Sequence, residues 1–171
     1  MTHTRTRLVA AAVCLIALHT TSANAQQATG SIDVTATVPT TCVLGTSTDV
    51  DFGTLTMVVG NGAVTATGSI DWACSDGTTA EIGIDGVNGT ASRQMTNPAP
   101  GSSPMPYNLY QSTGPNVDWG PLLSGDQLSG LAGSGISNVT TENVFGEIAE
   151  TNYIDAVPGS YSQTLTVTIE F

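Results

Sequence analysis

Residues 164–171 read Thr-Leu-Thr-Val-Thr-Ile-Glu-Phe, an unbroken alternation of polar and apolar side chains. Successive side chains of an extended strand point to opposite faces, so this alternation places one complete face in a core. The apolar face consists of Leu165, Val167, Ile169 and Phe171. The threonines and the valine suit a pleated, half-buried surface. We therefore predict a β-strand here.

The same two-residue period recurs upstream, whereas no window of 11 or more residues after position 26 shows a helical period. Further strands are predicted at 28–38, 64–74, 80–84, 107–111 and 144–148. Turn-forming residues separate them, at Asn61-Gly62, Asn88-Gly89, the proline-rich stretch 97–104, a flexible glycine-rich loop at 130–135, and Pro158-Gly159. Many short strands joined by turns predict an all-β, antiparallel β-sandwich in preference to a barrel.

The first 25 residues have the composition of a secretory signal peptide. Arg5 and Arg7 precede the apolar run Leu8–Leu18, which is too short to span a bilayer. Small residues at positions 23 and 25 predict cleavage before Gln26. Thr6 separates the two arginines, so this is not a twin-arginine signal. We expect an exported domain of residues 26–171, which contains no run of 18 apolar residues.

The chain is acidic, with 14 acidic residues, 3 basic residues and a formal net charge of −11. Removing the signal peptide leaves Arg93 as the single cation and a formal charge of 1 − 14 = −13. A surface of this kind has no basic footprint for a phosphate backbone, which excludes nucleic-acid binding. Both histidines fall within the first 20 residues, so catalytic sites and metal sites that need histidine are excluded from the exported domain.

Two cysteines, Cys42 and Cys74, remain after removal of the signal peptide. Export to an oxidising compartment predicts a disulfide between them. Such a bond closes a loop of about 33 residues, which the chain-entropy model values at about 3.5–4 kcal/mol. The absence of a CxxC motif and of a nearby cation argues against a redox role.

The exported chain begins with an alternating segment and ends on its best strand, with no later residues to pair with that strand. The apolar phase of the first segment holds Ala28, Gly30, Ile32, Val34, Ala36 and Val38. In one interpretation, 28–38 is the first strand of its own sandwich. In the other, the sandwich keeps an open edge and an exposed core groove, which a strand from another chain covers.

Several short motifs, taken in order, carry a resemblance to a known family. They are Ala28–Val34 followed by Cys42–Gly45, Asp51–Leu55, Tyr107–Tyr110 with Trp119-Gly120 downstream, Val144–Ile148, and Pro158–Tyr161 followed by Thr164–Phe171. With the spacing of the two cysteines, this set resembles the spore-coat-U-like domain, the subunit family of archaic chaperone–usher pili. The resemblance covers nearly all of the exported chain.

The resemblance implies an incomplete immunoglobulin-like antiparallel β-sandwich that lacks its last strand and is completed by a donor strand. A periplasmic chaperone would lend that strand, and at an outer-membrane usher the N-terminal extension of the next subunit would replace it. Carried onto this sequence, 26–38 would be the donor extension and 39–171 the sandwich.

The donor face would consist of Ala28, Gly30, Ile32, Val34, Ala36 and Val38, and the acceptor edge of Leu165, Val167, Ile169 and Phe171. The implied product is a structural subunit of a surface pilus, built from neighbouring copies or related subunits and supporting adhesion or biofilm formation. No catalytic residues, metal or cofactor are implied.

Three other functions stay open. The first is a secreted, coat-like structural protein without pilus assembly. The second is a module that binds Ca²⁺ or glycans, with Trp72 and Trp119 as sugar platforms and carboxylates at Asp49, Asp51, Asp71, Asp76 and Asp85. These carboxylates lack the dense spacing of a Ca²⁺ loop, which favours a solvated acidic surface. The third is a glycoside hydrolase, although nothing singles out a carboxylate pair.

Overall fold

A computed structural model describes residues 26–85, 93–114 and 117–171. The chain divides into two compact units, 1–37 and 38–171, each treated by itself below. The described part of the first unit, 26–37, contains no helix or strand. The structure therefore shows no strand at 28–38, where one was predicted. The predicted signal peptide and the Asn88-Gly89 turn lie outside the described residues.

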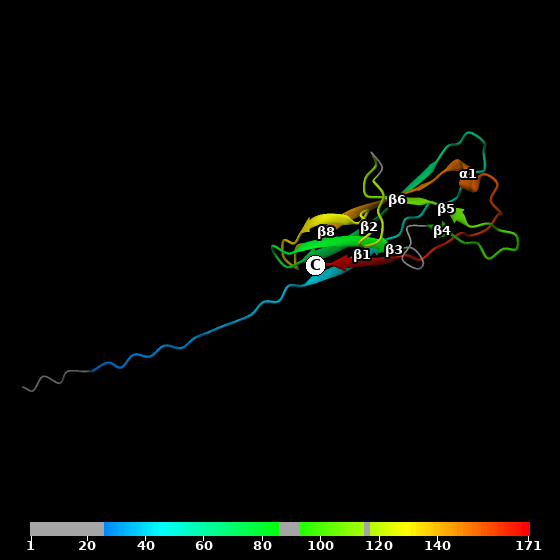
Figure 1. Cartoon of the computed structure of the whole chain (residues 1–171). Coiled ribbons are helices and arrows are strands. Elements are labelled where there is room, and N and C mark those ends of the chain that lie inside the picture. Colours follow the sequence, from blue (N-terminus) through cyan, green and yellow to red (C-terminus); the bar gives the residue numbers. More distant parts are fainter. Residues whose placement is uncertain (1–25, 86–92, 115–116) are drawn as a thin grey trace, which may run out of the picture. The chain divides into compact units, whose positions relative to one another are not determined.

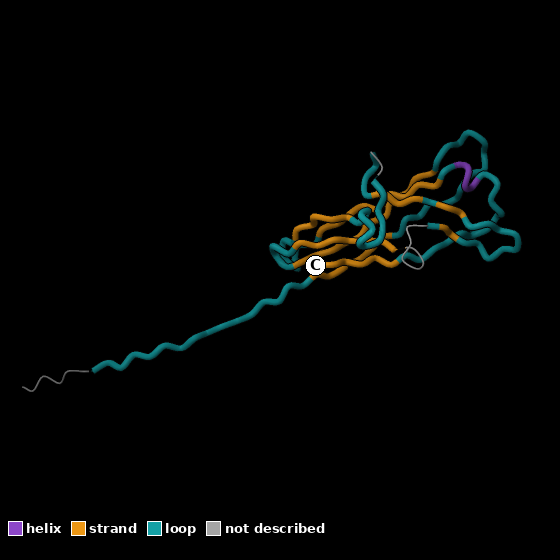
Figure 2. Tube along the Cα trace, viewed as in Figure 1, coloured by secondary structure: helices purple, strands orange, loops and turns teal. Residues whose placement is uncertain are grey.

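The second unit is an antiparallel β-sandwich (Figures 1 and 2). Its elements are β1 (Cys42–Thr48), β2 (Val64–Cys74), β3 (Thr79–Asp85), β4 (Gln94–Met95), β5 (Met105–Pro106), β6 (Asn108–Tyr110), β7 (Leu128–Ala132), β8 (Thr140–Ile148), α1 (Glu150–Tyr153) and β9 (Thr166–Glu170). One sheet has the order β1-β2-β8-β6 and the other β7-β3-β9, while β4 and β5 form a small separate pair. The predicted all-β, antiparallel fold class is confirmed.

Alternating side chains of both sheets fill one core. Ile70 and Trp72 of β2, Ile82 of β3 and Ile148 of β8 are all buried in a single apolar cluster. These residues lie on the faces that the two-residue period assigned to the core. The period therefore predicted β2, β3 and β8 correctly, because the core selects every second side chain in each of these strands.

β1 was not predicted as a strand. It lies at the edge of its sheet, and six of its seven residues are exposed, so its sequence has no reason to alternate. Cys42 lies directly opposite Cys74 of β2, with the two Cα atoms 4.1 Å apart, and the two residues form the predicted disulfide. The bond ties the start of this edge strand to a buried position.

The structure corrects the prediction of a flexible loop at 130–135. Leu128–Ala132 form β7, and the pairing of β7 with β3 shifts register beside Gly130, whose φ of 72° suits a β-bulge. Gly133 has a different reason: a Cβ there would lie 2.2 Å from the carbonyl oxygen of Ser75. These glycines fit a tightly packed edge rather than a loop.

A buried hydrogen-bond cluster links the segment around Trp119 to β3. The indole N–H of Trp119 donates to the carbonyl of Ile82 at 2.9 Å. The guanidinium of Arg93 donates to the carbonyls of Ile84, at 2.9 Å, and Trp119, at 2.5 Å. Burial lowers the pKa of Arg93 from its ordinary value. Arg93, the single cation of residues 26–171, thus donates to buried backbone carbonyls inside the fold.

No helix among the described residues is long and apolar enough to cross a membrane.

Candidate strand-acceptor groove

One edge of the second sheet is open. β9 pairs with β3 through five residue pairs, and in the described part of the chain no strand lies on its other side. Leu165, Val167 and Ile169, predicted as acceptor-edge residues, are half-buried against the core. Phe171, predicted on the same face, follows the strand and is 56% exposed. The open edge offers free backbone groups beside an incompletely covered core.

The segment 49–57, directly after β1, faces this region and belongs to no strand ladder. Val50, Phe52 and Leu55 pack half-buried against the core. Two glycines let the segment approach the first sheet closely. A Cβ on Gly146 would lie 2.5 Å from Cγ1 of Val50, and one on Gly68 would lie 2.5 Å from the carbonyl oxygen of Thr48. Both glycines share the two-residue phase of the core-facing residues in their strands, a pattern that does not by itself reveal this role.

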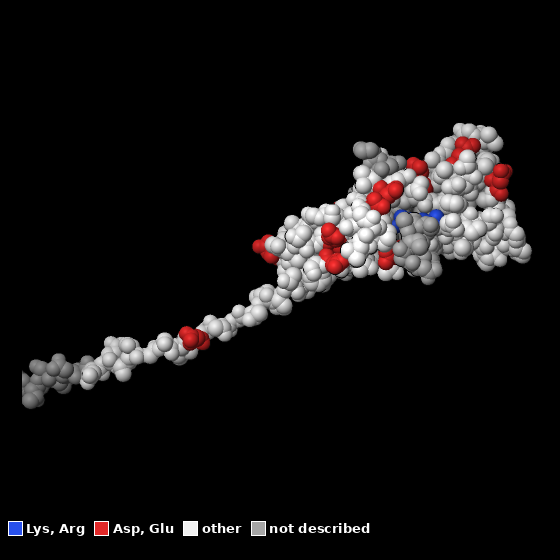
Figure 3. All heavy atoms as spheres, in the orientation of Figure 1, with Lys and Arg blue, Asp and Glu red and all other residues white. Residues whose placement is uncertain are grey.

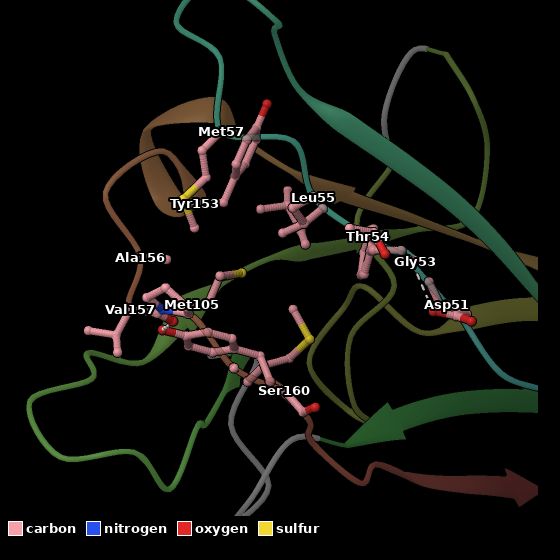
Figure 4. A pocket seen from close by; sticks show the side chains of 17 residues that line it. Asp51, Gly53, Thr54, Leu55, Met57, Met105, Tyr153, Ala156, Val157 and Ser160 are labelled. Atoms are coloured by element: carbon pink, nitrogen blue, oxygen red, sulfur yellow. Dashed lines mark hydrogen bonds between the residues drawn. The ribbon is translucent and has the colours of Figure 1, made fainter.

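Between the two segments lie two adjoining cavities. One, of about 550 Å³, has Ser47–Phe52 on one side and Tyr161–Leu165 on the other. The second, of about 520 Å³, has Val50–Leu55 and Ala156–Tyr161 as its sides (Figure 4). The cavities share lining residues, namely Val50, Asp51, Phe52, Met95 and Tyr161. They therefore form one continuous groove, called here the acceptor groove.

The floor of the acceptor groove is the core itself. Buried Ile70, Ile84, Leu109 and Val144 lie under the 550 Å³ cavity. Buried Met105, Ile148 and Tyr153 lie under the 520 Å³ cavity. Core side chains that line an open groove indicate a sandwich with one strand missing. An added extended segment would present a side chain to such a floor at every second position.

Hydrogen bonds hold the turn that follows the groove-lining segment 49–57. The carboxylate of Glu150 accepts hydrogen bonds from the backbone N–H groups of Gly60, at 2.6 Å, and Gly62, at 2.8 Å. The hydroxyl of Tyr153 donates to the carbonyl of Gly62 at 2.8 Å. α1, a single helical turn that the sequence did not predict, thereby fixes the residues that follow 49–57.

The opposite wall is fixed by side-chain and backbone bonds. The side-chain oxygen of Gln163 accepts from the backbone N–H of Gln94, at 3.0 Å, and from the hydroxyl of Tyr107, at 2.7 Å. Thr96 and Ser162 exchange two backbone hydrogen bonds, of 3.0 and 3.1 Å. Burial raises the pKa of Tyr107 above its ordinary value, which favours the protonated hydroxyl that donates the hydrogen bond to Gln163. Both walls are thus held in place with the groove open.

The residues proposed for Ca²⁺ or sugar binding do not come together as a site. Trp72 and Trp119 are buried, so neither can serve as a sugar platform. Among the described residues there is no group of three or more acidic, histidine or cysteine side chains suited to a metal ion. On the face drawn in Figure 3, the acidic side chains are scattered rather than gathered into one patch.

The predicted donor residues have no packing of their own. Ile32, Val34 and Val38 are 89%, 93% and 86% exposed. Nothing within 4 Å would meet a Cβ at Gly30. A run of nearly fully exposed, large apolar side chains on alternate positions is uncommon in a finished fold, and it indicates an interaction segment.

The chain was compared with curated proteins and with solved structures to find its relatives. A search of curated proteins finds no match. Among solved structures, the chain is similar to one in the crystal structure of the CsuC-CsuE chaperone–tip adhesion subunit pre-assembly complex from archaic chaperone-usher Csu pili of Acinetobacter baumannii. The match has 23% sequence identity and a TM-score of 0.52, and it covers 79% of this chain. It covers 40% of the other chain, and at this low sequence identity it supports the fold alone.

Family membership follows from a match between this chain and the family model of the Spore Coat Protein U domain. This model matches residues 28–168, which include both the exposed segment at 28–38 and both walls of the acceptor groove. The resemblance drawn from the motifs is thereby confirmed, and the chain belongs to the Spore Coat Protein U domain family.

Proposed function

We propose that the exported chain is a structural subunit of a surface pilus, assembled by the chaperone–usher pathway through donor-strand complementation. The acceptor groove is the observation that carries this proposal. Its floor consists of core residues, and one wall continues into β9, whose outer edge is unpaired in the described residues. A strand added there would gain backbone hydrogen bonds from the edge and cover the apolar floor.

The occupant in a fibre is the 28–38 segment of a neighbouring copy or related subunit. Ile32, Val34 and Val38 are exposed in the chain and share one phase, so one strand can place all three in the groove. Burying each large apolar side chain contributes about 1.5–3 kcal/mol. Ordering the segment opposes part of this gain. The remaining free energy, together with the backbone ladder, makes long-lived contacts between subunits.

Before assembly, a periplasmic chaperone covers the groove, and an outer-membrane usher exchanges the chaperone strand for the donor segment. The family membership supports these partners, as does the likeness to a structure whose title names a chaperone–subunit complex. Export by residues 1–25 delivers the subunit to the periplasm and then to the cell surface. Its role there is structural rather than enzymatic, and the pilus serves adhesion or biofilm formation.

The test is expression of the full chain with a matching chaperone and usher. We expect multimers that resist SDS at room temperature and dissociate on boiling. A chain that lacks residues 28–38 is the matched control, since it keeps the acceptor groove. It should form the chaperone complex but not chains of multimers. Absence of multimers from the full chain would overturn the pilus proposal in favour of a coat-like role, and multimers from the shortened chain would overturn the donor assignment.

A further inference from the structure

The three methionines of the exported domain converge on one half of the acceptor groove. Met57, Met95 and Met105 all line the 520 Å³ cavity, and Figure 4 labels Met57 and Met105. Met95 and Met105 lie directly opposite each other in the β4–β5 pair, and Met57 comes from the other side, at the end of the segment 49–57. We call this cavity the methionine half.

The other half has a different composition. Its apolar floor consists of Ile70, Ile84, Leu109 and Val144, and no sulfur-containing residue other than Met95 lines it. Branched aliphatic side chains are chemically inert. A thioether, by contrast, is converted by oxidants into a sulfoxide, which changes a flexible apolar side chain into a polar one.

The three methionine side chains differ in their exposure to solvent. Met57 is 47% exposed, Met95 is half-buried, and Met105 is 2% exposed. An oxidant in solvent therefore reaches Met57 first, Met95 next and Met105 last. Met57 and Met95 line a groove that an added strand would cover, so an occupant would shield both thioethers from solvent.

We propose that the methionine half is an oxidative modification site that controls occupancy of the acceptor groove, an inference that rests on the proposed function of the groove. A peroxide is the oxidant. The thioether sulfur attacks the hydroxyl oxygen of the peroxide, and the O–O bond breaks as the S–O bond forms. The proton of that hydroxyl passes to the leaving oxygen, which departs as water or an alcohol and leaves the sulfoxide. The sulfur loses two electrons, which the peroxide gains. Methionine sulfoxide reductase reverses the change.

The consequence follows from desolvation. A sulfoxide oxygen accepts strong hydrogen bonds from water, and a donor strand laid over the methionine half would strip that water away. Burying a polar group without a replacement partner weakens binding by about tenfold or more. An open, oxidised groove therefore rejects a donor strand, whereas an occupied groove protects its own methionines. Subunits damaged before assembly would be kept out of the fibre, and assembled subunits would stay intact.

The experiment uses the disulfide-bonded chain 26–171 and a fluorescent peptide with the sequence of residues 28–38. Peptide affinity is measured by anisotropy before and after limited hydrogen peroxide treatment, and mass spectrometry maps the sulfoxides. Circular dichroism verifies the fold. The matched control is the double variant Met57→Leu with Met95→Leu, which conserves volume and removes the two accessible thioethers.

We expect oxidation in the order Met57, Met95, Met105, and a loss of peptide affinity of about tenfold or more when the first two are oxidised. The double variant should have the same peptide affinity before and after peroxide treatment. Methionine sulfoxide reductase should restore the peptide affinity of the oxidised original chain. Bound peptide should slow the oxidation of Met95. Unchanged affinity after oxidation of Met57 and Met95, or an equal loss in the double variant, would overturn the proposal. Failure of the unoxidised chain to bind the peptide would overturn the proposed function of the groove as well.

Discussion

Replacing Val34 with Asp tests the donor segment most directly. Val34 is 93% exposed in the chain, so the substitution removes no packing from the subunit itself. In the acceptor groove of a neighbour, the same position would be buried. The change should therefore leave the chaperone-bound subunit soluble and folded, while preventing the subunit from entering a fibre as the incoming copy.

The expected loss of binding free energy for the donor strand has two parts. Loss of valine burial removes about 1.5–3 kcal/mol. An aspartate must also lose its hydration in a groove whose walls already carry Asp49 and Asp51, which costs several kcal/mol more unless the carboxylate is protonated. About 1.4 kcal/mol corresponds to a tenfold change in the dissociation constant. The donor strand should therefore bind more than about 100-fold more weakly.

The assay counts SDS-resistant multimers on cells that express the variant with chaperone and usher, alongside the amount of chaperone-bound subunit. Thr35→Asp is the matched control, because it places the same charge on the opposite face of the same strand. It should lower the yield far less. Equal yields from Val34→Asp and the unmodified chain would refute the reasoning. Loss of the chaperone-bound Val34→Asp subunit to proteolysis would show instead that 28–38 is part of its own fold.

Other parts of the fold give further expectations. Denatured, unreduced protein should label no free thiol, and replacing both Cys42 and Cys74 with Ser should lower the free energy of unfolding by about 3–4 kcal/mol in denaturant titrations; two labelled thiols would contradict the bond. Arg93→Met should destabilise the fold by about 2–4 kcal/mol, because two buried carbonyls lose their donor; an unchanged midpoint would show that these bonds contribute little. The pKa of Tyr107 is raised in the folded state, so its contribution to stability is complete below its unfolded pKa and is lost as pH rises through its folded pKa. Stability should therefore fall above about pH 10, and Tyr107→Phe should reduce this fall; equal pH profiles would refute the assignment. Finally, neither DNA nor anionic vesicles should retain the exported chain at low salt; salt-sensitive retention would reveal a local site that net charge hides.

Sequence alone predicted the elements that bury one face. β2, β3, β8 and β9 follow a two-residue period because the core selects every second side chain. The disulfide was equally predictable, since only two cysteines lie outside the predicted signal peptide. The exposed alternation at 28–38 was visible too, but the period could not say whether its apolar face is buried within the same chain or by another, because both uses require the same pattern.

Tertiary structure alone decided the groove. β1 shows no period because it is an exposed edge, and Gly130 looked like part of a loop because a bulge and a turn both favour a positive φ. The two walls, 49–57 and 156–167, are about a hundred residues apart in the chain. The first belongs to no strand ladder, and the second alternates only where it runs into β9. They become walls only when both sheets pack on one core and leave the outer edge of β9 uncovered. The same packing brings three methionines from separate segments to one cavity. Proximity between side chains of distant segments is set by packing, and it leaves no period in the sequence.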